Sequence, residues 1–208
     1  ITPITAFAAS VNYEKIGDYV STWHVASLGG LHWTDTGVHL IKADNQPAFC
    51  IEHGVLLNGG SGFTPSELNS TEKERLSLIS YYGYQVSPTM ENYGITQNII
   101  WEEFGDTLLT TQLPNYANRK NEIQTKVANH KIKPSFANQN ITLNVGDSIT
   151  LTDTNNVLSK YGNLLENSAN LKIEKNGNIL KLTATASSKE SGKLQYSMVP
   201  KDQVGQSF

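Results

Sequence analysis

The chain has 208 residues, of which 17% are charged, and a formal net charge of −3 at pH 7. This length is enough for one large domain or two small ones with a buried core. Nucleic acids and membrane surfaces are bound by concentrated basic faces, so the mild acidity predicts neither partner. No apolar run approaches the roughly 18 residues of a membrane-spanning helix, and no membrane insertion is expected.

The first ten residues, ITPITAFAAS, are apolar and uncharged. Ala6-Phe7-Ala8 has the A-x-A pattern of a signal-peptide cleavage site, which would indicate secretion. An ordinary first strand fits the same residues as well. A polar composition rich in Asn and Thr, with a single cysteine, is typical of an exported protein.

Residues 11–62 are predicted to be rich in strands. The runs 19–28, 37–43 and 48–57 combine β-branched, aromatic and apolar residues, and turn-forming residues separate them. Cys50, the only cysteine of the chain, lies in the third run. It is therefore expected on a buried strand.

Residues 64–130 are predicted to be helical. Thr64-Pro65-Ser66-Glu67 has a capping residue, a proline at the first helical position and a glutamate three residues after the cap. Three further segments have helical patterns. They are 70–83, with a capping box at Thr71 and Glu74 and a terminating Gly83, then 96–105, and 117–130.

Residues 135–208 return to the period-two pattern of strands. Asn176-Gly177 is a strong signal for a tight hairpin. The order strands, helices, strands predicts an α+β fold, a β-sandwich with a small inserted helical subdomain. A single domain is expected over residues 1–208. Its parts are a strand-rich part 11–62, a helical insertion 64–130 and the C-terminal strands 135–208 of the sandwich.

A lone cysteine can react in three ways. A peptidase needs a histidine partner and a thiol activated at a helix N-terminus, but Cys50 is in a strand-like run with no nucleophile motif around it. A metal site needs spaced ligands, which the five histidines do not provide, so neither a metal nor a cofactor is expected. The third reaction is displacement of ammonia from a glutamine carboxamide to form a thioester, which persists only where water is excluded. Gln97, beside Ile99, Ile100 and Trp101, is the candidate glutamine.

The segment AFCIEHG (48–54), followed by TQNIIWE (96–102), resembles the signature of the thioester domains of Gram-positive bacterial surface adhesins. The intervening EKERLSLISYYGY (72–84) is similar to the capped helix that ends in Gly-Tyr in that family. The resemblance covers most of residues 40–165. The sequence departs from the family pattern at Ile99, where alanine is usual, and in the short separation between the two motifs.

The resemblance implies that Cys50 is the thiol and Gln97 the acyl donor. Thr96 and Trp101 would position and shield the bond, and Phe49 would help to exclude water. Glu52 or His53 would take the thiol proton, and backbone N–H groups at the start of the helix would hold the oxyanion. On a regular strand Glu52 shares the face of Cys50, so Glu52 is favoured over His53.

The resemblance also implies a function. The chain would be an adhesin module that covalently captures an amine, a lysine of a host surface or matrix protein. Because each molecule reacts once, it would not be an enzyme. It would be a monomeric part of a longer, extracellular, cell-wall-anchored protein. The alternatives are a non-covalent β-sandwich ligand-binding module with a buried structural cysteine and, less favoured, a cysteine peptidase.

Overall fold

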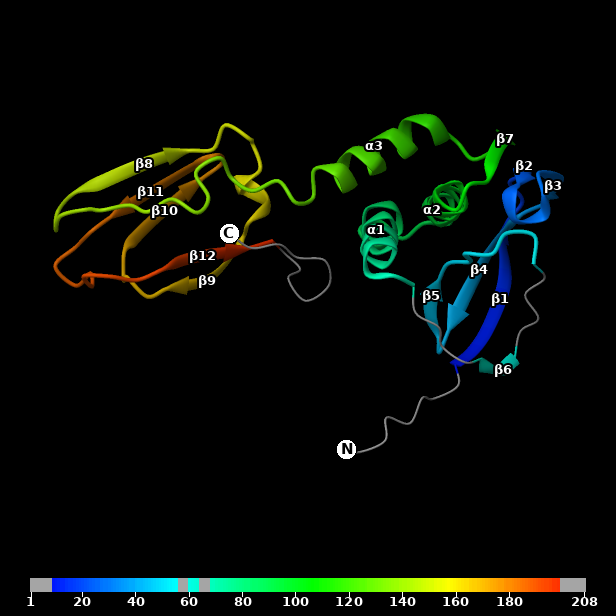
Figure 1. Ribbon diagram of the computed structural model, residues 1–208, viewed down its shortest axis with the longest axis horizontal. Coiled ribbons are helices and arrows are strands. Elements are labelled where there is room, and N and C mark those ends of the chain that lie inside the picture. Colours follow the sequence, from blue (N-terminus) through cyan, green and yellow to red (C-terminus); the bar gives the residue numbers. More distant parts are fainter. Residues whose placement is uncertain (1–8, 56–59, 64–67, 199–208) are drawn as a thin grey trace. The chain divides into compact units, whose positions relative to one another are not determined.

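The computed structural model describes residues 9–55, 60–63 and 68–198. The A-x-A pattern at Ala6–Ala8 and the helix start expected at Thr64–Glu67 lie outside the described residues. The chain divides into two compact units, Ile1–Val127 and Ala128–Phe208. Each unit has its own sheets (Figure 1).

The first unit contains two antiparallel sheets. One has the strand order β5-β4-β1-β6 and the other β3-β2-β7. A tight turn joins β4 to β5, and its residues Asp44 and Asn45 have φ values of 49° and 64°. Asp and Asn tolerate this left-handed conformation, which two-residue hairpins require. The strands are β1 (Ala9–Gly17), β2 (Ser21–Val25), β3 (Leu31–Asp35), β4 (Val38–Ala43), β5 (Gln46–Ala48), β6 (Gly60–Phe63) and β7 (Thr107–Thr111), and a short 3-10 helix covers Ala26–Leu28.

Three α-helices belong to the middle of the chain, as the sequence predicts: α1 (Ser70–Ser80), α2 (Met90–Glu103) and α3 (Tyr116–Ala128). The predicted capping box at Thr71 is wrong, because the side chain of Asn69 accepts the hydrogen bond from the backbone N–H of Glu72. Helix α3 matches its prediction, and its apolar residues Ile123 and Val127 are buried.

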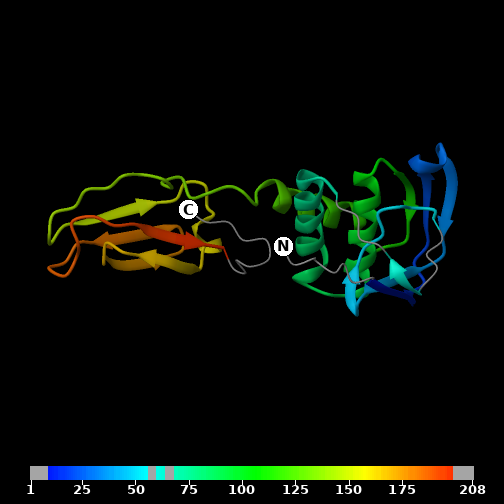
Figure 2. The same ribbon diagram turned by 60° about the horizontal axis from the view of Figure 1, so that its bottom comes forward.

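Helix α1 does not end at Gly83 but continues into a π-helical turn, Tyr81–Gln85. Gly83 has a packing role there. A Cβ atom at Gly83 would lie 2.2 Å from Oγ1 of Thr96, so only glycine lets this turn approach α2 so closely. Figure 2 shows α1 and α2 side by side from a second direction.

Helix α2 begins at Met90, where the side chain of Thr89 accepts a hydrogen bond from the N–H of Asn92. The predicted start at residue 96 is therefore wrong. Every residue from Tyr93 to Ile100 is buried, so α2 is a core helix of the first unit. The strand β7 follows it, within a region predicted to be helical, and pairs with β2.

The second unit contains two further antiparallel sheets, with the orders β10-β11-β8 and β12-β9. The predicted hairpin is confirmed, since Asn176 pairs with Ile179 and Gly177 has a φ of 54°. Residues 141–145, which belong to the region 135–208 with the predicted strand pattern, have no strand structure. The elements are β8 (Ser148–Thr152), a 3-10 helix (Leu158–Lys160), β9 (Asn163–Asn167), β10 (Lys172–Asn176), β11 (Ile179–Thr183) and β12 (Leu194–Ser197).

Side chains from both sheets of the second unit pack in one core. Leu180 and Leu182 of β11 pack in one apolar cluster with Tyr196 of β12 and with the fully buried Leu158 and Tyr161. Burial of side chains of this size stabilises a fold by about 1.5–3 kcal/mol each. The second unit thus has a core of its own.

The predicted α+β class is confirmed. The described strands pair only within their own unit, so no sheet contains strands of both units. That residues 1–208 act as a single domain stays a prediction. None of the described helices is long and apolar enough to cross a membrane.

Candidate functional site

Cys50 lies in an irregular segment directly after β5, not on the long strand that the sequence predicts. The strand ends at Ala48, whose carbonyl accepts a hydrogen bond of 2.6 Å from the hydroxyl of Tyr93. The same hydroxyl accepts one from the N–H of Ile41 on β4. Tyr93 of α2 therefore fixes the backbone just before Cys50. Because residues 49–55 are not extended, the alternation argument that favoured Glu52 does not apply.

The side chain of Gln97 reaches the backbone of Cys50 through two hydrogen bonds. The N–H of Cys50 donates to Oε1 of Gln97 at 2.8 Å, and Nε2 of Gln97 donates to the carbonyl of Cys50 at 2.7 Å. Gln97 is only 6% exposed. Two motifs far apart in the sequence thus meet, with the carboxamide held flat against the residue that carries the thiol.

Gln97 occupies the middle of α2, which changes the expected source of the oxyanion donor. Backbone N–H groups are free only in the first turn of a helix, and that turn starts at Met90. The donor that contacts the carbonyl oxygen of Gln97 is instead the N–H of Cys50. Negative charge that develops on this oxygen during acyl transfer would be stabilised by that N–H.

The thiol of Cys50 donates a hydrogen bond of 3.2 Å to the backbone carbonyl of Glu52. Burial raises the pKa of Cys50, and the negative charges of Glu52 and Asp35 raise it further. The hydrogen bond at Glu52 and the side chain of Trp101 oppose this rise. The thiol is therefore held protonated at neutral pH, unlike the activated thiolate of a cysteine peptidase.

The raised pKa predicts slow alkylation of Cys50 at neutral pH. In a Gln97→Met variant, which cannot form a thioester, iodoacetamide should label folded protein more slowly than urea-unfolded protein at pH 7. The labelling rate should rise over a higher pH range when the protein is folded, because only the thiolate reacts. The chain has no other cysteine, so the signal belongs to Cys50. Faster labelling of the folded form at pH 7 would contradict the prediction.

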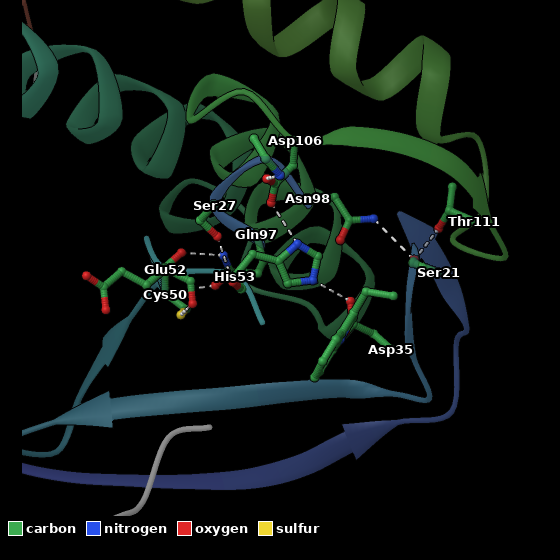
Figure 3. Close-up of polar contacts among 12 residues, drawn as sticks. Ser21, Ser27, Asp35, Cys50, Glu52, His53, Gln97, Asn98, Asp106 and Thr111 are labelled. Carbon is green, nitrogen blue, oxygen red and sulfur yellow. Dashed lines mark hydrogen bonds and ion pairs between the residues drawn. The ribbon is translucent and has the colours of Figure 1, made fainter. Parts of the chain in front are cut away.

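His53 lies between two carboxylates (Figure 3). Its Nδ1 is 2.8 Å from Oδ2 of Asp106, and its Nε2 is 2.9 Å from Oδ2 of Asp35. The His53 side chain is 3% exposed, that of Asp106 5% and that of Asp35 24%. These three residues are called the His53 clamp below. Each ring nitrogen of His53 thus faces one carboxylate oxygen.

The contacts of the His53 clamp affect the predicted roles of His53 and Glu52 as proton acceptors. Both nitrogens of His53 face aspartates, so the ring has no nitrogen available to pair with Cys50. Glu52 contacts the thiol through its backbone carbonyl, and its exposed carboxylate points away from His53 (Figure 3). That either residue serves as the proton acceptor stays a prediction.

Trp101 connects the His53 clamp to Cys50. Its ring stacks on the ring of His53 at a centroid distance of 3.8 Å and an interplanar angle of 3°, and Trp23 meets both rings edge-on. The indole N–H of Trp101 is buried and has no hydrogen-bond partner among the described residues. Interaction with Trp101 favours the thiolate of Cys50. Trp101 thus lies where the sequence motif implies, next to the thiol.

The other motif residues pack among their neighbours in the first unit. Phe49 stacks on Tyr93 with ring centroids 4.8 Å apart and meets Tyr84 edge-on. Thr96 is fully buried, and its hydroxyl donates to the carbonyl of Asn92 while its side chain packs against Gly83. Ile99, the departure from the family pattern, is also fully buried, so the core accommodates the larger side chain.

A cavity of about 360 Å³ opens beside the pair formed by Cys50 and Gln97. Sequence reasoning missed Asp35 and Asp106. Asp35 belongs to a segment, WTDTG, that reads as a turn, and Asp106 follows a helix end. No local pattern links positions 35, 53 and 106, so only the fold reveals the His53 clamp. The cavity is lined by Tyr13, Tyr19, Ser21, Trp33, Asp35, Gly37, Val38, His39, Ile41, Cys50, Glu52, His53, Gly54, Val55, Tyr93, Gly94, Gln97, Asn98, Trp101 and Leu113.

Comparison with solved structures shows that this fold is that of a bacterial thioester domain. The thioester domain of the Staphylococcus aureus TIE protein matches with a TM-score of 0.68 and 23% sequence identity. The match covers 91% of this chain and 81% of that chain, so it extends over both compact units. No protein-family model matches the chain, and no curated protein sequence matches it.

Proposed function

We propose that this chain is a surface adhesin module that forms an internal thioester between Cys50 and Gln97 and uses it to capture an amine. The observation that carries the proposal is the pair of hydrogen bonds between the carboxamide of Gln97 and the backbone of Cys50. The thioester-domain fold supports it. The partner would be a lysine of a host surface or matrix protein, and the module would be an extracellular part of a longer, cell-wall-anchored protein.

Formation of the bond is an acyl transfer. The step requires Sγ of Cys50 to leave the Glu52 carbonyl and to reach Cδ of Gln97. The Sγ–Cδ bond forms, the Cδ–Nε2 bond breaks, the thiol proton ends on the nitrogen, and ammonia leaves. The N–H of Cys50, already on Oε1, stabilises the oxyanion in this step. The buried surroundings of Gln97 then protect the bond from water.

Capture reverses the direction of acyl transfer with a different nitrogen. The amine attacks Cδ of Gln97, the Sγ–Cδ bond breaks, and a stable amide replaces the thioester while Cys50 regains its proton. The captured molecule stays on the chain as part of this amide. Each molecule therefore reacts once, as a covalent binder and not as an enzyme.

The intact mass of freshly purified protein tests the proposal. The protein should be lighter than its sequence by the mass of one ammonia, and Cys50 should not react with thiol reagents. Methylamine should add to Gln97 in one equivalent and make Cys50 reactive. A full mass together with a Cys50 that is labelled from the start would refute the thioester. Reversible ligand binding by such a protein would instead support a non-covalent module.

A further inference from the structure

The cavity beside Cys50 and Gln97 suits a cation with an apolar stem. Its lining includes two carboxylates, those of Asp35 and Glu52, and none of the lining residues is lysine or arginine. Aromatic rings make up much of the remaining wall: Tyr13, Tyr19, Trp33, Tyr93 and Trp101. Aromatic faces accommodate aliphatic chains and attract cations. At about 360 Å³, the cavity falls within the range of small-ligand sites.

Asp35 is the carboxylate of this cavity that the fold holds rigidly. Its Oδ1 accepts a hydrogen bond of 2.9 Å from the indole N–H of Trp33, and its Oδ2 faces Nε2 of His53. A carboxylate oxygen has two lone pairs, so each oxygen retains one for a further donor. With 24% of its side chain exposed, Asp35 is also the only open member of the His53 clamp. Asp35 and Cys50 line the same cavity.

Glu52 is less suited to hold a ligand. Its carboxylate is exposed and points away from His53 (Figure 3). A long, solvated side chain must lose conformational freedom to hold a cation in one position, and salt screens the interaction. Asp35, fixed by two partners, has already lost that freedom. The two acids of the cavity are therefore not equivalent.

We infer that Asp35 receives the ammonium group of the incoming amine and makes the site selective for a primary ammonium on an unbranched aliphatic stem. This inference rests on the proposed thioester. The ammonium binds to Asp35 and gives one proton to water beside it. The freed lone pair attacks Cδ of Gln97, the Sγ–Cδ bond breaks, and a second proton of the nitrogen ends on Sγ of Cys50. The third stays on the new amide.

The arrangement gives a reason for preferring capture over hydrolysis. Water and neutral nucleophiles gain no ion pair at Asp35, whereas an ammonium is concentrated next to the thioester by a charge-assisted hydrogen bond. The selectivity then comes from the ground-state encounter and from orientation of the amine toward Cδ. The His53 clamp acts on this step only by holding Asp35 in position.

The test compares two nucleophiles on the same variants by timed intact mass. At pH 7 n-butylamine is a cation, while hydroxylamine is mostly neutral. Asp35→Asn should react with n-butylamine about tenfold more slowly than wild type, as expected for loss of a charged hydrogen bond, and with hydroxylamine at nearly the same rate. Asp18→Asn, which removes the same charge from a side chain that is 93% exposed and does not line the cavity, is the matched control.

The outcomes separate the inference from the proposed function. A wild-type protein without the ammonia deficit refutes the thioester itself. A thioester that reacts in Asp35→Asn at wild-type rates with both reagents, or equally slowly with both, overturns only the role of Asp35. Loss of the n-butylamine preference in Glu52→Gln instead would also overturn it.

A second measurement tests the inference if the Asp35→Asn protein forms no thioester. In the Gln97→Met background, n-butylammonium is titrated and followed by NMR of the indole N–H signals. Shifts of the Trp33 and Trp101 signals that vanish on adding Asp35→Asn support the inference. Shifts that persist unchanged overturn it.

Discussion

Replacing Gln97 with glutamate is expected to abolish both the loss of ammonia and every covalent amine adduct. A glutamate keeps the length of the side chain and an oxygen that can accept from the N–H of Cys50. It has no amide nitrogen to expel, and a carboxylate is not attacked by a thiol. It also loses the donor to the carbonyl of Cys50. The effect is therefore all or none, and intact mass before and after methylamine measures it.

Two further variants complete this prediction. Gln85→Glu makes the same change at an exposed glutamine of the first unit and should leave the ammonia deficit as in wild type. Cys50→Ala should have the full mass, because the other reacting group is gone. A Gln97→Glu protein that still forms an amine adduct would mean that another residue is the acyl donor.

The second large effect is expected on stability. Replacing His53 with alanine leaves the carboxylate of Asp106 buried with one remaining partner, the N–H of Ala26. It also removes the ring that stacks on Trp101. Leaving a buried carboxylate short of a partner typically costs about 3–5 kcal/mol, so the free energy of unfolding of the first unit should fall by about that amount.

Urea unfolding followed by tryptophan fluorescence measures this change. Trp23, Trp33 and Trp101 are all in the first unit, so the second unit does not contribute to the signal. Both proteins should carry Cys50→Ala, so that no cross-link differs between them. His24→Ala, at an exposed position of β2, is the control and should change stability by less than about 0.5 kcal/mol. A loss below 1 kcal/mol for His53→Ala would show that the His53 clamp contributes little.

The sequence was most predictive where local patterns carry the structure. Helix α3 has one apolar stripe, with Ile123 and Val127 one turn apart, and its position was predicted closely. Helix α2 is buried on all sides and contains the polar residues Thr96, Gln97 and Asn98. Such a helix has no stripe to detect, which explains why its first turns were missed.

In the site, too, some features could be predicted from local sequence patterns and others could not. Cys50 and Gln97 were identified because their neighbours form two short motifs, and the structure brings the two residues together. The environment of the pair could not be predicted. Strand β5 ends at Ala48 because Tyr93, more than forty residues away, bonds to its carbonyl. Asp35 and Asp106 join the site only through the pairing of β2 with β3 and with β7.

The burial of α2 has a mechanical consequence for the proposed covalent attachment. An amide on Gln97 would transmit any pulling force to the middle of this helix and not to a loop. Residues Tyr93–Ile100 are all buried, so a force on the adduct cannot detach them one at a time, as it could detach exposed residues. It must extract a packed core element, with Tyr93 still bonded to β4 and β5. The proposed attachment point thus lies in a buried core helix of the first unit.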